Sequence, residues 1–313
     1  MDKYQWLPSE SAYHSYPMQI VKGDFIFKDR STIYLPAGKV VNNGWGEIGS
    51  NHLVGDKLKP LPCELKLSWF SYTEDKFYAG DFTLPFDKIK ALFKAGVLSS
   101  STGQKISYET IIVGLAPGGC VSIWLETEGL VLEVATFQAS EVKLDWKSVL
   151  DNEHVSRKDY IHMVLEEALG QDGLVELKIK GIPENLSEVH RKQYDWAPEV
   201  AGAKLLALKL KTNNGEYETF NSLVGPRDRV NRAVPKTIYL DWQDAQGAKF
   251  TFEAELSEGE AIQAYDKLGT GKENVKMKLL LEISQKTHDL EISLMSQQYL
   301  LKLERVKVKV NSI

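Results

Sequence analysis

Short stretches in which polar and apolar residues alternate run through most of this chain. In residues 64–70, Leu65, Leu67 and Trp69 alternate with polar or smaller neighbours. A period of two places these three side chains on one face of a strand. Similar strand patterns, separated by Gly-rich turns, occur at residues 18–27, 76–84, 108–115, 121–126 and 130–144. The pattern predicts a mainly β fold of the α+β class.

Three segments have helical spacing instead. Residues 86–95 carry apolar side chains on one helical face, and Gly96 follows as a stop signal. A second helix is expected at residues 259–268, before Gly269. Between these two, a connecting helix is expected from a helix start of the Ser-x-x-Asp type to Gly170. Its apolar stripe can pack on either half of the chain or between them, and the sequence leaves these alternatives open.

The second half repeats the order of elements of the first. The spacing that separates Trp69 from Trp242 also separates Phe77 from Phe250, and other strand and helix positions follow it. We therefore expect two related β-sheet or sandwich-like domains from a divergent tandem repeat, each with one helix. The expected boundaries are residues 1–155 for the first domain, 156–172 for the connecting helix and 173–313 for the second domain.

Composition narrows the class of protein. The chain has 313 residues, and its formal net charge of −5 argues against a dedicated nucleic-acid-binding protein. Its apolar runs are too short for a transmembrane segment. The N-terminus, as written, shows no secretion signal. Two alternatives remain, a cytoplasmic protein or a chain whose signal has been removed.

Candidate chemistry is sparse. Cys63 and Cys120 are the two cysteines, too few for a disulfide scaffold or a four-cysteine zinc site. One disulfide between them remains an alternative, although their apolar context favours two free thiols. The six histidines are scattered, and phosphate-binding or nucleophile motifs are missing from the sequence. The sequence thus predicts no catalytic residues, no metal site and no cofactor.

Two segments are candidates for binding a partner. The first is the Gly-rich loop at residues 42–56, with Trp45 between two glycines and His52 further along. An exposed aromatic side chain there would anchor a protein partner; the alternative is that Trp45 folds back over a sheet edge. The second candidate segment, residues 225–232, contains three arginines, a residue type favoured at interfaces. They are Arg227, Arg229 and Arg232. Ordinary solvated surface is the alternative for this segment.

The first half also resembles a known family. The segments that carry the resemblance are residues 34–38, 43–46, 67–78 and 108–119. They resemble a bacterial family of uncharacterised envelope lipoproteins that has only a domain-of-unknown-function label. The resemblance covers about residues 4–170 and is weak in the second half. In gene setting, the family is similar to proteins that accompany antibacterial toxins, and some members look like immunity proteins against phospholipase effectors of type VI secretion.

The resemblance implies a non-enzymatic protein that binds and blocks a cognate toxin in the periplasm. Members of the family usually begin with a lipoprotein signal and a lipidated Cys, which this chain does not show, so a lipid anchor is expected only for a longer form. The alternative function is an envelope structural or ligand-binding lipoprotein without a toxin partner, and an enzyme comes third. The alternative location is the cytoplasm.

Overall fold

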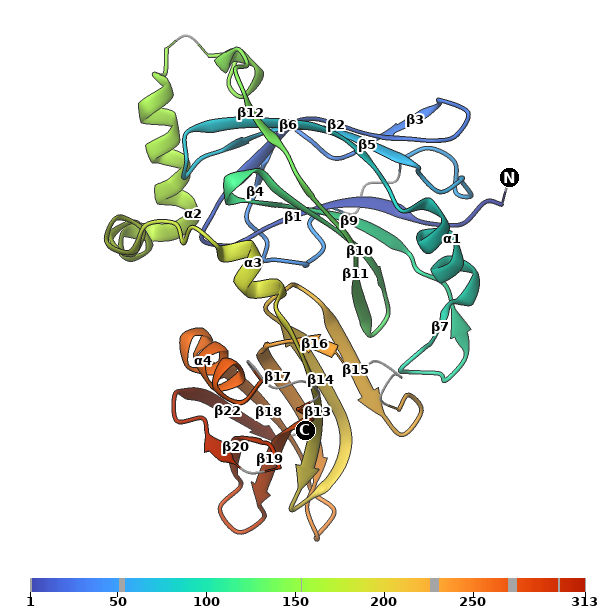
Figure 1. The fold of residues 1–313 in the computed structure, drawn as a ribbon, viewed down its shortest axis with the longest axis vertical. Coiled ribbons are helices and arrows are strands. Elements are labelled where there is room, and N and C mark those ends of the chain that lie inside the picture. The colour runs from blue at the N-terminus through green and yellow to red at the C-terminus, as the bar shows by residue number, and fades with distance from the viewer. Residues whose placement is uncertain are drawn as a thin grey trace. The chain divides into compact units, whose positions relative to one another are not determined.

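The computed structural model describes residues 2–50, 54–152, 154–225, 231–269, 275–297 and 299–312. The chain forms two compact units (Figure 1). The first comprises Met1–Val97, Ile106–Thr127 and Val131–Ser187, and the second comprises Leu98–Lys105, Glu128–Leu130 and Glu188–Ile313. The short strands β7 (Val97–Leu98) and β8 (Lys105–Ile106) pair with each other. The mainly β, α+β fold is confirmed.

The first unit is built from two sheets. One has the order β1-β9-β10-β11, with β1 parallel to β9. Its strands are β1 (Leu7–Ala12), β9 (Thr110–Ala116), β10 (Cys120–Thr127) and β11 (Leu130–Gln138). The other has the order β12-β6-β5-β2-β3, with β4 also paired to β2. Its strands are β12 (Ser140–Val142), β6 (Lys76–Thr83), β5 (Glu64–Ser71), β2 (Met18–Ile26), β3 (Thr32–Tyr34) and β4 (Val40–Val41).

The alternation that predicts these strands also describes their burial. Leu65, Leu67 and Trp69 are all buried, and the Trp69 ring stacks on Tyr78 with centroids 5.5 Å apart. Helix α1 (Phe86–Ala95) follows β6, as expected, and Gly96 ends it with φ +60° while its N–H donates to Leu92 O. The expected turn at residues 117–119 is the short 3₁₀ element η1 (Pro117–Gly119). A second such element is η2 (Trp146–Ser148).

Helix α2 (Arg157–Lys180) begins as predicted but extends further. Ser156 caps it by accepting a hydrogen bond from Asp159 N–H. Gly170 has φ +66° and breaks the helix, yet a second helical segment continues to Lys180. The expectation that the helix ends at Gly170 is therefore only half right, because glycine at positive φ kinks the chain without preventing a new turn of helix.

The first segment of α2 packs on the first unit, which decides an alternative that the sequence left open. Its apolar residues contact the cluster that contains Phe70 and Phe77 of the β5–β6 hairpin. Arg157 fixes the start of the helix, because Nε and Nη2 donate to the Asp75 carboxylate at 2.8 and 2.6 Å. A short helix, α3 (Leu186–Arg191), follows α2.

The second unit also contains two sets of paired strands. One has the order β16-β13-β19-β20-β21, with β13 parallel to β19. Its strands are β16 (Asn231–Ala233), β13 (Gln193–Ala201), β19 (Met277–Ser284), β20 (Asp289–Met295) and β21 (Leu300–Lys302). The other has the order β15-β14-β17-β18-β22. Its strands are β15 (Tyr217–Asn221), β14 (Lys204–Thr212), β17 (Pro235–Gln243), β18 (Lys249–Leu256) and β22 (Val306–Ser312). Helix α4 (Glu258–Gly269) follows β18.

The two units have the same topology. In each, the first strand runs parallel to a strand that comes after the helix, β9 or β19, and the helix follows an antiparallel hairpin. The strand paired to that hairpin has an irregular register at the same place, opposite Trp69 in β2/β5 and opposite Trp242 in β14/β17. Both indoles are fully buried. A shared β-bulge beside equivalent tryptophans is a specific feature that supports duplication of one ancestral unit.

The units differ in where their last strand changes sheet. In the first unit, the nine-residue strand β11 is the neighbour of β10, and the three-residue strand β12 joins β6. In the second unit, β21 has three residues beside β20, and the seven-residue strand β22 pairs with β18. In the second unit the chain thus leaves β20 after a short pairing and changes sheet early. As a result, among the described residues, Asp289–Glu291 of β20 pair with β19 on one side and with no strand on the other.

Candidate functional site

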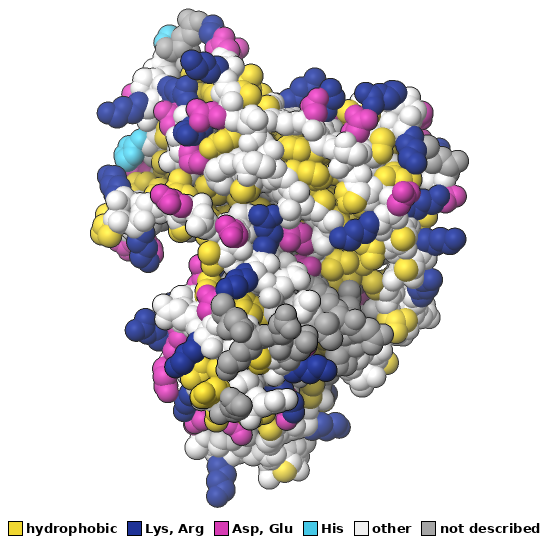
Figure 2. Space-filling model, in the orientation of Figure 1, with side chains coloured by type: hydrophobic (Ala, Val, Ile, Leu, Met, Phe, Trp, Pro, Cys, Tyr) yellow, Lys and Arg dark blue, Asp and Glu magenta, His cyan; other side chains and the backbone are white. Residues whose placement is uncertain are grey.

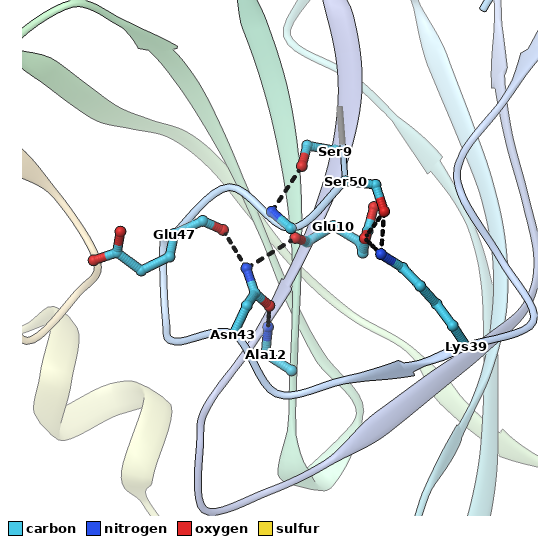
Figure 3. A network of polar contacts seen from close by, with 8 residues as sticks. Ser9, Glu10, Ala12, Lys39, Asn43, Glu47 and Ser50 are labelled. Atoms are coloured by element: carbon cyan, nitrogen blue, oxygen red, sulfur yellow. Dashed lines mark hydrogen bonds and ion pairs between the residues drawn. The ribbon is translucent and has the colours of Figure 1, made fainter. Parts of the chain in front are cut away.

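The Gly-rich loop is described at residues 42–50 and 54–56, and its first part lies along strand β1 (Figure 3). Trp45 is 8 % exposed, because its ring stacks on Tyr13 at 4.4 Å and meets the edge of Trp124 at 4.7 Å. A Cβ at Gly114 would lie 2.9 Å from Trp45, so this position of β9 has room only for glycine. Of the two alternatives for Trp45, the exposed anchor is wrong and the folded-back side chain is the one found, because aromatic side chains distant in sequence enclose the indole.

Polar contacts fix the loop to β1. The Asn43 side chain donates to Glu47 O at 2.7 Å and to Glu10 O at 3.3 Å, and it accepts from Ala12 N–H. The Ser11 hydroxyl donates to Gly44 O, and the Ser9 hydroxyl accepts from Gly49 N–H, continuing the same pattern along β1. The Asn43 bonds satisfy the backbone groups Glu10 O and Ala12 N–H on the edge of β1 opposite β9, which would otherwise be open to another strand.

A buried carboxylate lies at the end of this network. Glu10 is fully buried, and its Oε1 accepts from Ser50 Oγ at 2.6 Å and lies 2.7 Å from Lys39 Nζ. Lys39 also contacts Ser50. Glu10 Oε2 has no hydrogen-bond partner among the described residues. An ion pair of this kind holds the loop in one place, since a buried charge is costly without its partner.

One of the segments that carry the family resemblance, residues 67–78, contains a glutamate with a structural role. Glu74, in the β5–β6 turn, accepts hydrogen bonds from Tyr78 Oη at 2.9 Å and from Gly118 N–H at 2.9 Å. Its other oxygen accepts from Ser71 Oγ. Burial, followed by the hydrogen bond with Glu74, raises the pKa of Tyr78 well above its usual value. Glu74 thus joins two hairpin turns of the first unit.

The arginine-rich candidate is only partly described. Arg227 and Arg229, like His52 of the first candidate, lie outside the described residues. Arg232 is 4 % exposed, with Nε 3.2 Å from Glu218 Oε2 and Nη1 donating to Trp196 O. Arg232 is therefore part of the interior of the second unit, and the expectation of a surface position for it is wrong.

The second unit has an open groove that sequence reasoning missed. Its volume is about 410 Å³, and residues of β20, the end of β21 and β22 line it. Val308 and Val310 of β22 are 37 % and 45 % exposed. In the register of β22 with β18, they lie opposite Ala254 and Phe252, which are completely buried. The two valines therefore belong to the core-facing side of their sheet but remain partly open to solvent.

Two charged residues of the groove pair with each other. Lys302 Nζ lies 3.1 Å from Glu291 Oε2, and Asp289, His288 and Glu304 complete the polar lining. In the described part of the chain, no group of His, Cys, Asp and Glu residues could hold a metal ion. Cys63 and Cys120 are both free thiols. The partly exposed valines of β22, and not a set of reactive or metal-binding side chains, are what distinguish the groove.

On the face shown in Figure 2, acidic and basic side chains are interspersed and do not form a patch of one sign. Among the helices that are described, none combines the length and apolarity that a membrane crossing requires.

Comparison with known families finds a match for the first part of the chain. The model of a family described as "Protein of unknown function (DUF2931)" matches residues 1–183. The chain belongs to this family. No curated protein and no solved structure matches the chain. The DUF2931 match ends just after α2, so the strands of the second unit from β13 onward lie beyond it although they repeat the same topology.

Proposed function

We propose that this DUF2931 protein acts by binding another protein, and that the partner is an antibacterial toxin, with type VI phospholipase effectors as the leading class. The chain would act in the periplasm as an immunity protein. The resemblance of its first half to envelope proteins that accompany such toxins supports the choice of partner. The single structural observation that supports binding is the open edge of the second unit, with Val308 and Val310 partly exposed.

Partly exposed valines on the core-facing side of a sheet differ from scattered apolar residues on a surface. They form a continuous apolar row with Val306, and this row lies beside a groove. Continuous apolar surface rimmed by charged residues is typical of an interaction site. Among the described residues of the first unit, by contrast, the family-like motifs contact one another and hold its turns and loop in place.

A second candidate function is the binding of a small apolar ligand by an envelope protein. The volume of the groove, about 410 Å³, supports this candidate because it falls within the range of about 300–1,000 Å³ that is usual for ligand pockets. Protein binding is favoured because the groove lies between strand edges, which are suited to pairing with another strand.

The test is protection of cells by the full chain. The gene product encoded beside this chain is expressed in the periplasm of a sensitive host, with and without the chain targeted to the same compartment. We expect the chain to restore growth and to co-purify with the toxic product. Unchanged killing, with the chain present and folded in the periplasm, would contradict the proposed function. Protection without a complex would point to a different mechanism and also contradict it.

A further inference from the structure

We propose that the outer edge of β22 is the docking site, and that its occupant is an extended strand of the partner in which apolar residues alternate with acidic residues. This inference rests on the proposed function of protein binding. It adds the position of the interface, the conformation of the bound segment and its charge pattern.

The position follows from the strand order. In the described part of the chain, β22 ends the order β15-β14-β17-β18-β22 and pairs with β18 alone. Such an edge has backbone N–H and C=O groups directed outward and can accept a further strand. The seven residues of β22 provide a longer edge than the three residues of its counterpart β12 in the first unit.

One face of β22 determines where the bound strand needs apolar residues. Val306, Val308 and Val310 lie on the same face as Leu256, Ala254 and Phe252 of β18, their partners in the register. A strand added to the outer edge would place alternate side chains beside these valines. Apolar side chains at those positions would cover the surface that the early change of sheet leaves open.

The opposite face of β22 determines which charge the bound strand needs. Lys307 lies opposite Glu255, and Lys309 lies opposite Glu253 with Nζ 3.8 Å from Oε2. Both lysines are exposed, so a strand on their other side would be next to a row of positive charges. Opposite charges across neighbouring strands are stabilising and like charges are destabilising. The bound strand therefore needs Glu or Asp at the positions that alternate with its apolar residues.

The same charges argue against a second copy of this chain as the occupant. Two copies of β22 paired edge to edge in antiparallel register would bring Lys307 and Lys309 of one copy beside those of the other. The valine rows would match, but the lysine rows would repel each other. The lysines also discourage indiscriminate pairing of the exposed edge, which is a common protection of edge strands.

The chain itself supplies a suitable probe. Residues 249–257, which include β18, have the sequence Lys-Phe-Thr-Phe-Glu-Ala-Glu-Leu-Ser, and in the structure this segment pairs with the inner edge of β22. A fluorescently labelled peptide with this sequence is titrated with the full chain and followed by fluorescence anisotropy. The control peptide carries lysine at both glutamate positions. We expect the acidic peptide to bind at least about tenfold more tightly.

Variants of the full chain locate the peptide. Val308→Thr with Val310→Thr should weaken binding of the acidic peptide by at least about tenfold. Lys307→Glu with Lys309→Glu should reverse the preference and favour the basic control peptide. Lys267→Glu, an exposed charge reversal on α4, is the control for a change of charge away from β22 and should leave binding unchanged. Thermal unfolding of each variant verifies that the chain is folded.

Three results would overturn the inference. They are failure of both peptides to bind, equal binding of both peptides, and binding of the acidic peptide that the β22 variants do not change. These results are distinguishable from failure of the proposed function. If the toxin still forms its complex with the β22 variants at unchanged affinity, protein binding stands and its site lies elsewhere. If the original chain forms no complex with the toxin, the proposed function itself fails.

Discussion

Val308 and Ala254 are partners in the antiparallel register of β22 and β18, yet Val308 is 37 % exposed whereas Ala254 is completely buried. Val308 lines the groove between β20, the end of β21 and β22, where β21 has only three residues and pairs with Ser293–Met295 of β20. The unit folds with part of its core-facing surface uncovered. A binding surface can therefore be lost by mutation here without great loss of stability.

The first prediction concerns that separation of binding from stability. Val308→Thr should change the free energy of unfolding of the second unit by less than about 1 kcal/mol, because the side chain is already partly in water. Leu279→Ala, at a fully buried position of β19, should cost about 2–5 kcal/mol. Urea unfolding of both variants provides the measurement. A loss for Val308→Thr as large as that for Leu279→Ala would show that the valine is part of a closed core.

The second prediction concerns the duplicated tryptophans. Trp69→Ala and Trp242→Ala should each destabilise their own unit by about 3–5 kcal/mol, because both indoles are fully buried beside stacked aromatic rings. Hydrogen exchange in β5 and β17 reports each unit separately. Retention of native protection in β5 after Trp69→Ala would contradict the burial of that side chain, and the same holds for β17 and Trp242.

The third prediction concerns the ion pair that holds the Gly-rich loop. Lys39→Met leaves the buried Glu10 carboxylate without its cation, and it should cost about 1–3 kcal/mol. Adding Glu10→Gln should recover part of that loss, because the buried group is then neutral. A double-mutant cycle from urea unfolding measures the coupling between the two residues. Strictly additive effects would show that Glu10 and Lys39 do not interact.

The fourth prediction concerns acid stability. The hydrogen bond with His190, which is 3.0 Å away, is the main cause that lowers the pKa of Glu258 below its ordinary value of 4.5. A carboxyl group with a lowered pKa stabilises the fold above the unfolded pKa, and this contribution is lost as pH falls through the folded value. The stability difference between the original chain and Glu258→Gln should therefore shrink between about pH 5 and pH 3. A difference that stays constant over this range would contradict the pKa shift.

Much of the fold can be predicted from local patterns. The alternation around Trp69 and the helical spacing before Gly96 and Gly269 depend on burial of one face, so the sequence shows them directly. The spacing between Trp69 and Trp242 also indicates the repeat. It does not reveal the shared bulge, because pairing irregularities depend on the partner strand as well as on the strand itself.

The candidate site could not be predicted in the same way. Burial of Trp45 depends on Tyr13 and Trp124, and burial of Arg232 depends on Glu218 and Trp196, all of which are distant in sequence. In β22, valine alternates with lysine, a pattern that is typical of a half-buried strand and gives no sign that the apolar face is uncovered. The groove beside these valines is also lined by β20 and the end of β21, which are strands of the opposite sheet.

The most direct test of the central claim is the affinity of the full chain for the purified product of the adjacent gene, which the proposed function takes to be the toxin. Calorimetry measures this affinity for the original chain and for Val308→Thr with Val310→Thr. The account predicts a complex with the original chain and at least about tenfold weaker binding by the folded double variant. The absence of any complex with the original chain would contradict the proposed function. Equal affinity of the two proteins would contradict the assignment of the open edge as the binding site.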